Sequence, residues 1–256
     1  MLKPILICIL AGAGAGLGTG FAGMSAAAVI SPMLITFLNA DPYMAVGIAL
    51  ASDVLASAAS AITYGKNKNL DIKNGLIMML AVLCFTMVGS YIASIVPKTA
   101  MGNFSVFMTL LLGIKFIVRP VIAPKKRLAT ATGKQKAIRS VLCGAMVGLV
   151  CGFVGAGGGM MMLLVLTSVL GYELKTAVGT SVFIMSATAL TGAVSHFAIG
   201  GAPDVIMLVV CVLSTLLFAQ LAALFANKAQ PKTLNRITGA ILVILGVAIL
   251  GVNYFG

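Results

Sequence analysis

Long apolar runs separated by short polar connections follow one another along the 256-residue chain. Most of these runs approach the ~20 residues that a helix needs to cross the hydrocarbon core of a bilayer. The sequence lacks the short alternating stretches that are typical of a transmembrane β-barrel. Because backbone polar groups in lipid must be paired within their own segment, the pattern predicts an all-α integral membrane protein.

An internal repeat divides the chain into two halves. Sliding the sequence by 132 positions superimposes several glycine and small-residue motifs, and a Pro-Lys-Thr tripeptide returns after two residues of drift. The matched segments are 16–17 with 148–149, 20–23 with 152–155, 45–47 with 177–179, and 97–99 with 231–233. We therefore predict two homologous membrane repeats, 1–122 and 138–256, joined by a basic linker at 123–137. Such duplication is common in secondary transporters.

Turn and cap residues mark the helices within each repeat. The clearest start is Asn39-Ala40-Asp41-Pro42, which places a proline in the first turn of a helix. The expected helices cover residues 39–64, 74–96, 100–118, 176–197, 204–226 and 234–254.

The first apolar segment of each half is too long for one straight crossing. Segment 4–38 has 35 residues and segment 138–170 has 33, so a continuous helix would measure ~50 Å against a core of ~30 Å. Each segment carries a glycine cluster in its middle, where glycine weakens a helix by ~1 kcal/mol per residue. The sequence therefore predicts either a glycine-broken helix or a helical hairpin that turns within the membrane.

The composition is that of a membrane protein, and the positions of the basic residues explain the high positive charge. Hydrophobic residues make up 61% of the chain and charged residues only 9%, against about a quarter in soluble domains. The net charge is +12, but seven of the seventeen basic residues lie between Arg119 and Arg139. Because cytoplasmic loops of membrane proteins collect lysine and arginine, we interpret this charge as a topology signal and expect no nucleic-acid partner.

The basic residues also orient the repeats. If each first segment turns back or crosses twice, the halves are inverted, and fourteen basic residues lie on one side against Lys3 and Lys98 on the other. A parallel arrangement divides them eleven to five. The positive-inside rule favours inverted repeats in the cytoplasmic (inner) membrane, with linker 119–139 cytoplasmic. Since the chain has no tryptophan, we expect its five tyrosines and its lysines to anchor the membrane interfaces.

A glycine-rich motif, GLVCGFVGAGGG, occupies residues 148–159. Gly148, Gly152 and Gly155 have the spacing that lets membrane helices pack closely. The denser run from Gly155 to Gly159 could instead expose backbone N–H groups to an anion at the start of the following helix. Both interpretations stay open from the residues alone, and no Gly-Lys-Ser/Thr ending follows to indicate a nucleotide loop.

This pattern, GxxxGxxGxGGG followed by Ala-Val-Gly-Thr-Ser at 177–181, resembles the TauE/SafE sulfite-exporter family. The resemblance covers essentially the whole chain, including its size, duplicated halves and basic linker. The first half departs from the motif, since residues 24–27 read Met-Ser-Ala-Ala where a glycine run would be. The resemblance implies export or uptake of sulfite, an organosulfonate or a related small anion through the cytoplasmic membrane.

The two motifs and the hydroxyl residues that follow them are the expected substrate site. Backbone amides at the broken helices would meet the anion, and the halves would rock to alternate access. The expected substrate-binding residues are Gly20, Gly23, Ser25, Gly155, Gly157, Gly158, Gly159, Thr180 and Ser181. The serine and threonine side chains equally fit helix–helix packing, so this interpretation also stays open.

Ionisable residues inside membrane spans are costly and mark functional candidates. Asp53 lies mid-span and is interpreted either as a proton- or cation-coupling carboxylate or as one partner of a buried ion pair with Lys115, the only mid-span lysine. His196, the only histidine, is a second coupling candidate. Its alternative interpretation is a polar helix end that faces the headgroups.

No residue pattern indicates a cofactor or a metal site. The five cysteines show no CxxC or Cys/His spacing, so we expect buried thiols. The expected partners are a small inorganic or organosulfur anion and the lipid bilayer, and the sequence leaves a homodimer open. We predict a transporter rather than an enzyme. The alternatives are an anion channel of the same architecture and an intramembrane hydrolase with Ser25 and His196, which no strand-turn-helix context supports.

Overall fold

The computed structural model describes residues 2–93, 110–111, 114–115, 117–118, 133–154, 158–200 and 202–255. Within these ranges every regular element is an α-helix, as the apolar runs predict. The repeat boundaries near residues 122 and 138 stay predictions, because most of the linker lies outside the described residues.

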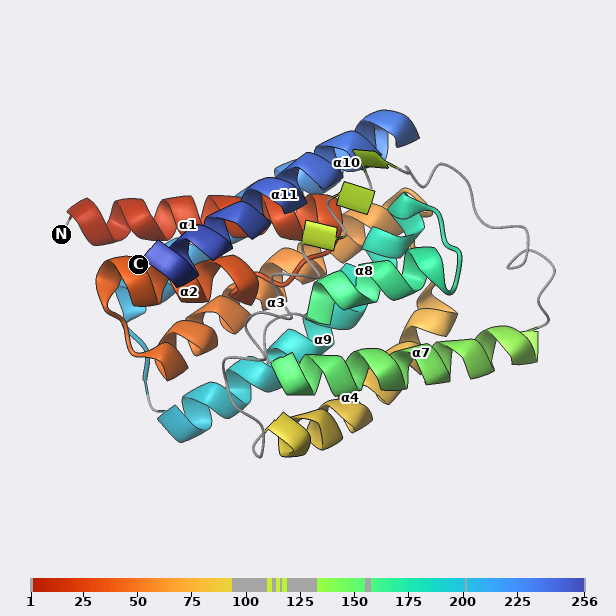
Figure 1. Cartoon of the computed structure of the whole chain (residues 1–256), viewed down its shortest axis with the longest axis horizontal. Helices are drawn as coiled ribbons and strands as arrows, with labels where there is room; N and C mark the ends of the chain where they lie inside the picture. The colour runs from red at the N-terminus through yellow and green to blue at the C-terminus, as the bar shows by residue number, and fades with distance from the viewer. Residues whose placement is uncertain are drawn as a thin grey trace.

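The first apolar segment is a helical hairpin. It consists of α1 (Leu2–Ala22) and α2 (Ala27–Leu38), which contact each other, and Figure 1 shows α2 running back alongside α1. The chain begins to reverse at Gly23, whose φ of +59° lies in the left-handed region that favours glycine. Of the two arrangements predicted for this segment, the structure therefore has the hairpin.

The first apolar segment of the second half also contains two helices. α7 (Gly133–Val154) is followed by α8 (Gly158–Ser168), and the two are in contact. Figure 1 shows α8 running back beside α7. The intervening residues 155–157, which include two of the predicted substrate contacts, lie outside the described residues.

Five long helices complete the described bundle. They are α3 (Pro42–Lys66), α4 (Ile72–Ala93), α9 (Leu174–Gly200), α10 (Val205–Lys228) and α11 (Pro231–Phe255). Asp41, Asp71 and Asp204 precede three of them and accept the backbone N–H three residues on, so that orphan amides of the first turn are paired. These bounds agree closely with the predicted helices. The predicted helix at 100–118 is helical where the structure describes it, at 110–111, 114–115 and 117–118.

The two halves interlock through helices that come from opposite ends of the sequence. α1 packs along α10, α7 packs along α4, and α3 packs against α9. Glycines make the first two contacts close: Gly16 and Gly20 face backbone atoms of α10, and Gly144 and Gly148 face backbone atoms of α4. The close-packing interpretation is thus confirmed for Gly148. The halves share one core rather than forming two separate cores.

Gly16 provides a test of this close packing. A Cβ on Gly16 would lie 2.5 Å from the Thr215 carbonyl oxygen and 2.8 Å from the Ala219 backbone nitrogen. Because backbone cannot yield there, we expect Gly16→Ala to separate α1 from α10 and to reduce the free energy of unfolding by about 2 kcal/mol. The melting temperature in detergent should fall by about 4 °C or more. Gly251→Ala is the control, since nothing lies within 4 Å of its added Cβ; equal melting temperatures would contradict the close packing.

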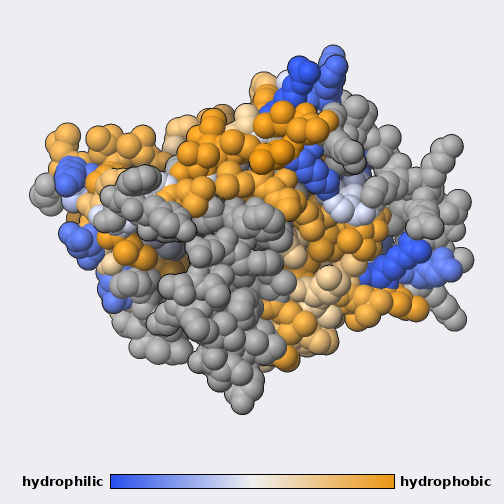
Figure 2. Space-filling view, in the orientation of Figure 1, coloured by the Kyte–Doolittle hydropathy of each residue, from blue (hydrophilic) through white to orange (hydrophobic). Residues whose placement is uncertain are grey.

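Apolar side chains cover the outside of the bundle as well as its core. Among the residues that the structure describes, four helices are long and apolar enough to cross a membrane, namely Leu2–Ala22, Met44–Lys66, Leu174–Val194 and Val205–Lys228. α10 shows this most clearly, with Leu213, Leu217 and Leu221 all about half exposed. Figure 2 shows hydrophobic residues over much of the coloured part of the visible face, and hydrophilic ones toward its left edge and its upper right and right. An apolar outer surface of this kind is typical of a protein that is surrounded by lipid.

Three of the described connections and the start of α7 lie at one end of the bundle. In Figure 1 the α3–α4, α8–α9 and α10–α11 connections and the start of α7 all lie on the right, whereas the N-terminus lies on the left. The basic residues at these positions are Lys66, Lys68, Lys73, Lys134, Lys136, Arg139, Lys175, Lys228, Lys232 and Arg236. Most of the positive charge of the described residues is therefore concentrated at that end.

Candidate functional site

The candidate site lies where the first hairpin turns, in contact with the start of α8. Gly159, in the first turn of α8, is buried against residues 23–26, which connect α1 to α2 and which we call the reversal. A Cβ on Gly159 would lie 2.6 Å from the Gly23 carbonyl oxygen and 2.7 Å from the Ser25 backbone nitrogen. The structure thus brings together three of the predicted substrate contacts, which come from the two different halves.

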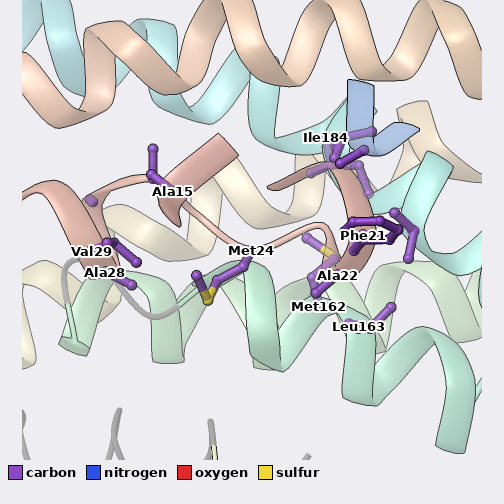
Figure 3. Close-up of a cluster of buried hydrophobic side chains, with 14 of the residues drawn as sticks. Ala15, Phe21, Ala22, Met24, Ala28, Val29, Met162, Leu163 and Ile184 are labelled. Atoms are coloured by element: carbon purple, nitrogen blue, oxygen red, sulfur yellow. The ribbon is translucent and has the colours of Figure 1, made fainter. Parts of the chain in front are cut away.

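Buried apolar side chains surround this meeting point. Met24 is fully buried on the connection between α1 and α2, and Met162 and Leu163 of α8 belong to the same core cluster as Phe21 and Ala22 at the end of α1. Figure 3 shows Met162 and Leu163 near Ala22 and Phe21, with Met24 on the connection itself. Because water has little access to such a cluster, polar groups within it interact in a low dielectric.

Asp53 reaches the reversal from the middle of α3. Its side chain is 1% exposed and accepts hydrogen bonds from Ser25 Oγ at 2.9 Å and Ser57 Oγ at 2.8 Å. The backbone N–H of Ala26 also interacts with the carboxylate. Lys115, the ion-pair partner considered from the sequence, instead donates to Ser168 on α8. Asp53 is therefore held by a hydroxyl of its own helix and by a hydroxyl and a backbone amide of the first hairpin.

Three further hydroxyls hold carbonyl groups in or just before the reversal. Ser181 of α9 donates to the Gly23 carbonyl at 3.1 Å, and Thr19 donates to the Met24 carbonyl at 2.8 Å. Tyr64 of α3 is fully buried and donates to the Gly20 carbonyl at 2.8 Å. The prediction that every tyrosine anchors a membrane interface is therefore wrong for Tyr64. Its spacing of eleven residues from Asp53 and seven from Ser57 places it on the same helix face as both, which is a signal that could have identified it.

The other predicted site residues face different neighbours. The Cα of Gly20 packs against Ala219 and Ala222 of α10, and Thr180 accepts the backbone N–H of Asp71 at 3.2 Å near the α3–α4 connection. His196 lies in α9, but its side chain is outside the described part of the structure. Among the remaining hydroxyl residues of α9, Ser186, Thr188 and Thr191 bond to carbonyls of their own helix, which fits the packing interpretation.

Two hydrogen bonds join the two halves at the basic end of the bundle, and a third supports them from within the second half. Tyr172 donates to Asp71 Oδ2 at 2.8 Å and Asn69 donates to Asn227 Oδ1 at 2.7 Å, while Lys175 donates to the Asn227 carbonyl at 2.8 Å. We call these five residues the end latch. Burial raises the pKa of the Tyr172 phenol, and its hydrogen bond to Asp71 raises it further. The phenol therefore stays protonated and able to donate at neutral pH.

Comparison with known sequences agrees with this architecture. The model of the family described as "Sulfite exporter TauE/SafE" matches residues 8–249. The chain belongs to the TauE/SafE family. Relatives of the chain carry the name probable membrane transporter protein, and we conclude that this TauE/SafE protein is a membrane transporter.

Three relatives illustrate the similarity. The chain is 26% identical to Probable membrane transporter protein YunE of Bacillus subtilis (strain 168), over 92% of this chain and 90% of the relative. Probable membrane transporter protein YdhB of the same organism is 23% identical over 83% of this chain and 86% of the relative. A Probable membrane transporter protein of Haemophilus influenzae is 26% identical over 78% of this chain and 76% of the relative.

Proposed function

We propose that this TauE/SafE protein is a secondary transporter that carries a small sulfur oxyanion, such as sulfite or an organosulfonate, across the cytoplasmic membrane by alternating access. The observation that carries the proposal is the buried start of α8. Its first turn contains no acidic residue, and it abuts the first reversal. A helix N-terminus offers unpaired N–H groups and a partial positive charge, so it would stabilise a small anion.

The anion class rests on the family and on this chemistry. The family description names sulfite, and the oxygens of a sulfur oxyanion accept several N–H bonds at once. The melting temperature of the purified protein, measured in sulfite, sulfate, thiosulfate or a short alkanesulfonate at constant ionic strength, tests this class. We expect at least one of these anions to raise it. No shift with any of the four would contradict the proposed substrate class.

The proposed orientation places the basic end of the bundle and linker 119–139 in the cytoplasm, with inverted halves. Two observations support it: each half starts with two antiparallel helices, and the connections that carry most of the basic residues share one end. Both are what inverted repeats and the positive-inside rule require.

Alternating access requires the end latch to open during each cycle. We expect a short bifunctional thiol reagent to stop transport in Asn69→Cys/Asn227→Cys protein, because the bonded side chains of these residues lie in different halves. The test is uptake before and after cross-linking in a background without the native cysteines. Each single-cysteine variant, treated with the same reagent, is the control. Full transport by the cross-linked protein would contradict opening at this end.

Asp53 is the proposed coupling residue, with His196 as a second candidate on α9. The carboxylate lies mid-span, contacts the reversal that would move, and can gain or lose a proton. We expect Asp53→Asn to remove the dependence of uptake on an imposed pH gradient. Such dependence also separates a coupled transporter from a channel of the same architecture. Unaltered pH dependence in Asp53→Asn would contradict this role.

A further inference from the structure

Each of the five acidic residues of the chain lies next to the start of a helix. For one of them, that helix is not the one to which the residue belongs. Asp41, Asp71 and Asp204 cap the helices that follow them, and Glu173 directly precedes α9. Asp53 instead lies in the middle of α3. Its carboxylate meets the residues that open α2.

The amides at the start of α2 are already bonded. Ala26 N–H interacts with Asp53, Ala27 N–H donates to Ser25 Oγ at 3.4 Å, and Ala28 N–H donates to the Ser25 carbonyl at 3.2 Å. Ser25 Oγ itself donates to Asp53. An external anion at this position would find these donors taken and would meet a buried like charge.

We propose that Asp53, in its ionised form, is a resident anion: its carboxylate occupies the anion position at the start of α2 and closes the first half to external anions. Carboxylates accept hydrogen bonds only, and the groups that face Asp53 are two hydroxyls and an amide, all able to donate. The partial positive charge of the α2 N-terminus is thereby neutralised from the adjacent helix α3. This inference does not depend on which anion the protein transports.

The second half differs at the corresponding positions. The shift of 132 residues places Met185 where Asp53 stands and Gly157 where Ser25 stands. Met185 is buried, and its sulfur would lie 2.7 Å from a Cβ on Gly159, so it faces the start of α8 as Asp53 faces the start of α2. The two halves are thus chemically unequal: one has a built-in anion, and the other has a thioether and a glycine run. We therefore expect each protein molecule to bind one external anion, at the start of α8.

Formate rescue tests the resident anion directly. Asp53→Ala deletes the carboxylate and leaves a cavity of its size beside Ser25 and Ser57, which formate can refill. We expect sodium formate to raise the melting temperature of purified Asp53→Ala protein by about 3 °C or more over sodium chloride of equal ionic strength. Wild type and Asp53→Asn should gain less, because a side chain fills the position in both and only the start of α8 stays open to formate. Formate that stabilises none of the three, or all three equally, would overturn the proposal.

Asp53→Asn provides a second measurement if Asp53→Ala cannot be purified. Asparagine keeps the shape of the side chain and removes its charge, so we expect the melting temperature to fall by about 4 °C or more. A variant as stable as wild type would show that the start of α2 needs no resident charge and would overturn the proposal. Both measurements are made without substrate, so their failure is distinguishable from a failure of the proposed transport function.

Discussion

Replacing Met185 with aspartate is expected to abolish anion uptake. A carboxylate at this position would give the second half the resident anion that Asp53 gives the first. It would accept the N–H groups at the start of α8 and would repel a second anion in a low dielectric. We expect uptake of the transported anion into proteoliposomes to fall by about 100-fold or more, which corresponds to the loss of one well-placed set of donors.

Met185→Asn is the matched control for this substitution. Asparagine has the size and polarity of aspartate but no charge, so we expect measurable uptake to remain. Both proteins would first be shown to be monodisperse and folded. Wild-type uptake by Met185→Asp would contradict an anion site at the start of α8, and an equal loss in both variants would contradict the electrostatic explanation.

The second large effect is expected at Gly159. Its added Cβ would meet two backbone atoms of the reversal, the Gly23 carbonyl oxygen at 2.6 Å and the Ser25 nitrogen at 2.7 Å. Because main-chain atoms cannot move aside without displacing the hairpin, Gly159→Ala should push α8 away from α1 and α2. We expect uptake to fall below detection and the melting temperature to drop by about 4 °C or more.

Gly65→Ala is the control for Gly159→Ala. It also adds a methyl group to a membrane helix, but its nearest neighbour would be Leu70 Cδ2 at 3.4 Å, which is an ordinary contact. We expect near-normal uptake and stability from this variant. If Gly159→Ala transported as well as Gly65→Ala, the contact between the two halves at this point would not be needed for function.

The helices could largely be predicted from the sequence, because their ends depend on nearby residues. Asp41 and Pro42 mark the start of α3 whatever packs against it, and Asp204 does the same for α10. The length of segment 4–38 and its glycine cluster likewise limit it to a break or a hairpin. The choice between those two required the structure, since both satisfy the same length.

The pairing of helices across the halves could not be predicted. Gly16 and Gly159 cannot be told apart by their sequence context. In the structure, Gly16 contacts the backbone of α10, whereas Gly159 contacts the reversal of the first hairpin. The partner of a glycine is set by distant residues, and nothing local specifies it.

The same limit applies to the polar site residues. Lys115 and Asp53 form a plausible ion pair from composition alone, because each needs a partner in the membrane. The structure gives each a different partner: Lys115 contacts Ser168, and Asp53 contacts Ser25 and Ser57. Ser57 lies four residues from Asp53 and was within reach of a helical periodicity argument, whereas Ser25 was not, because its position depends on the hairpin.

Proteoliposome uptake is the most direct test of anion transport by this protein. Purified protein would be reconstituted and supplied with sulfite, sulfate, thiosulfate or a short alkanesulfonate, with and without an imposed pH gradient. We predict uptake of at least one of these anions, with a rate that depends on the gradient and that Met185→Asp abolishes. Failure of folded wild-type protein to take up any of them under either condition would contradict the proposed function.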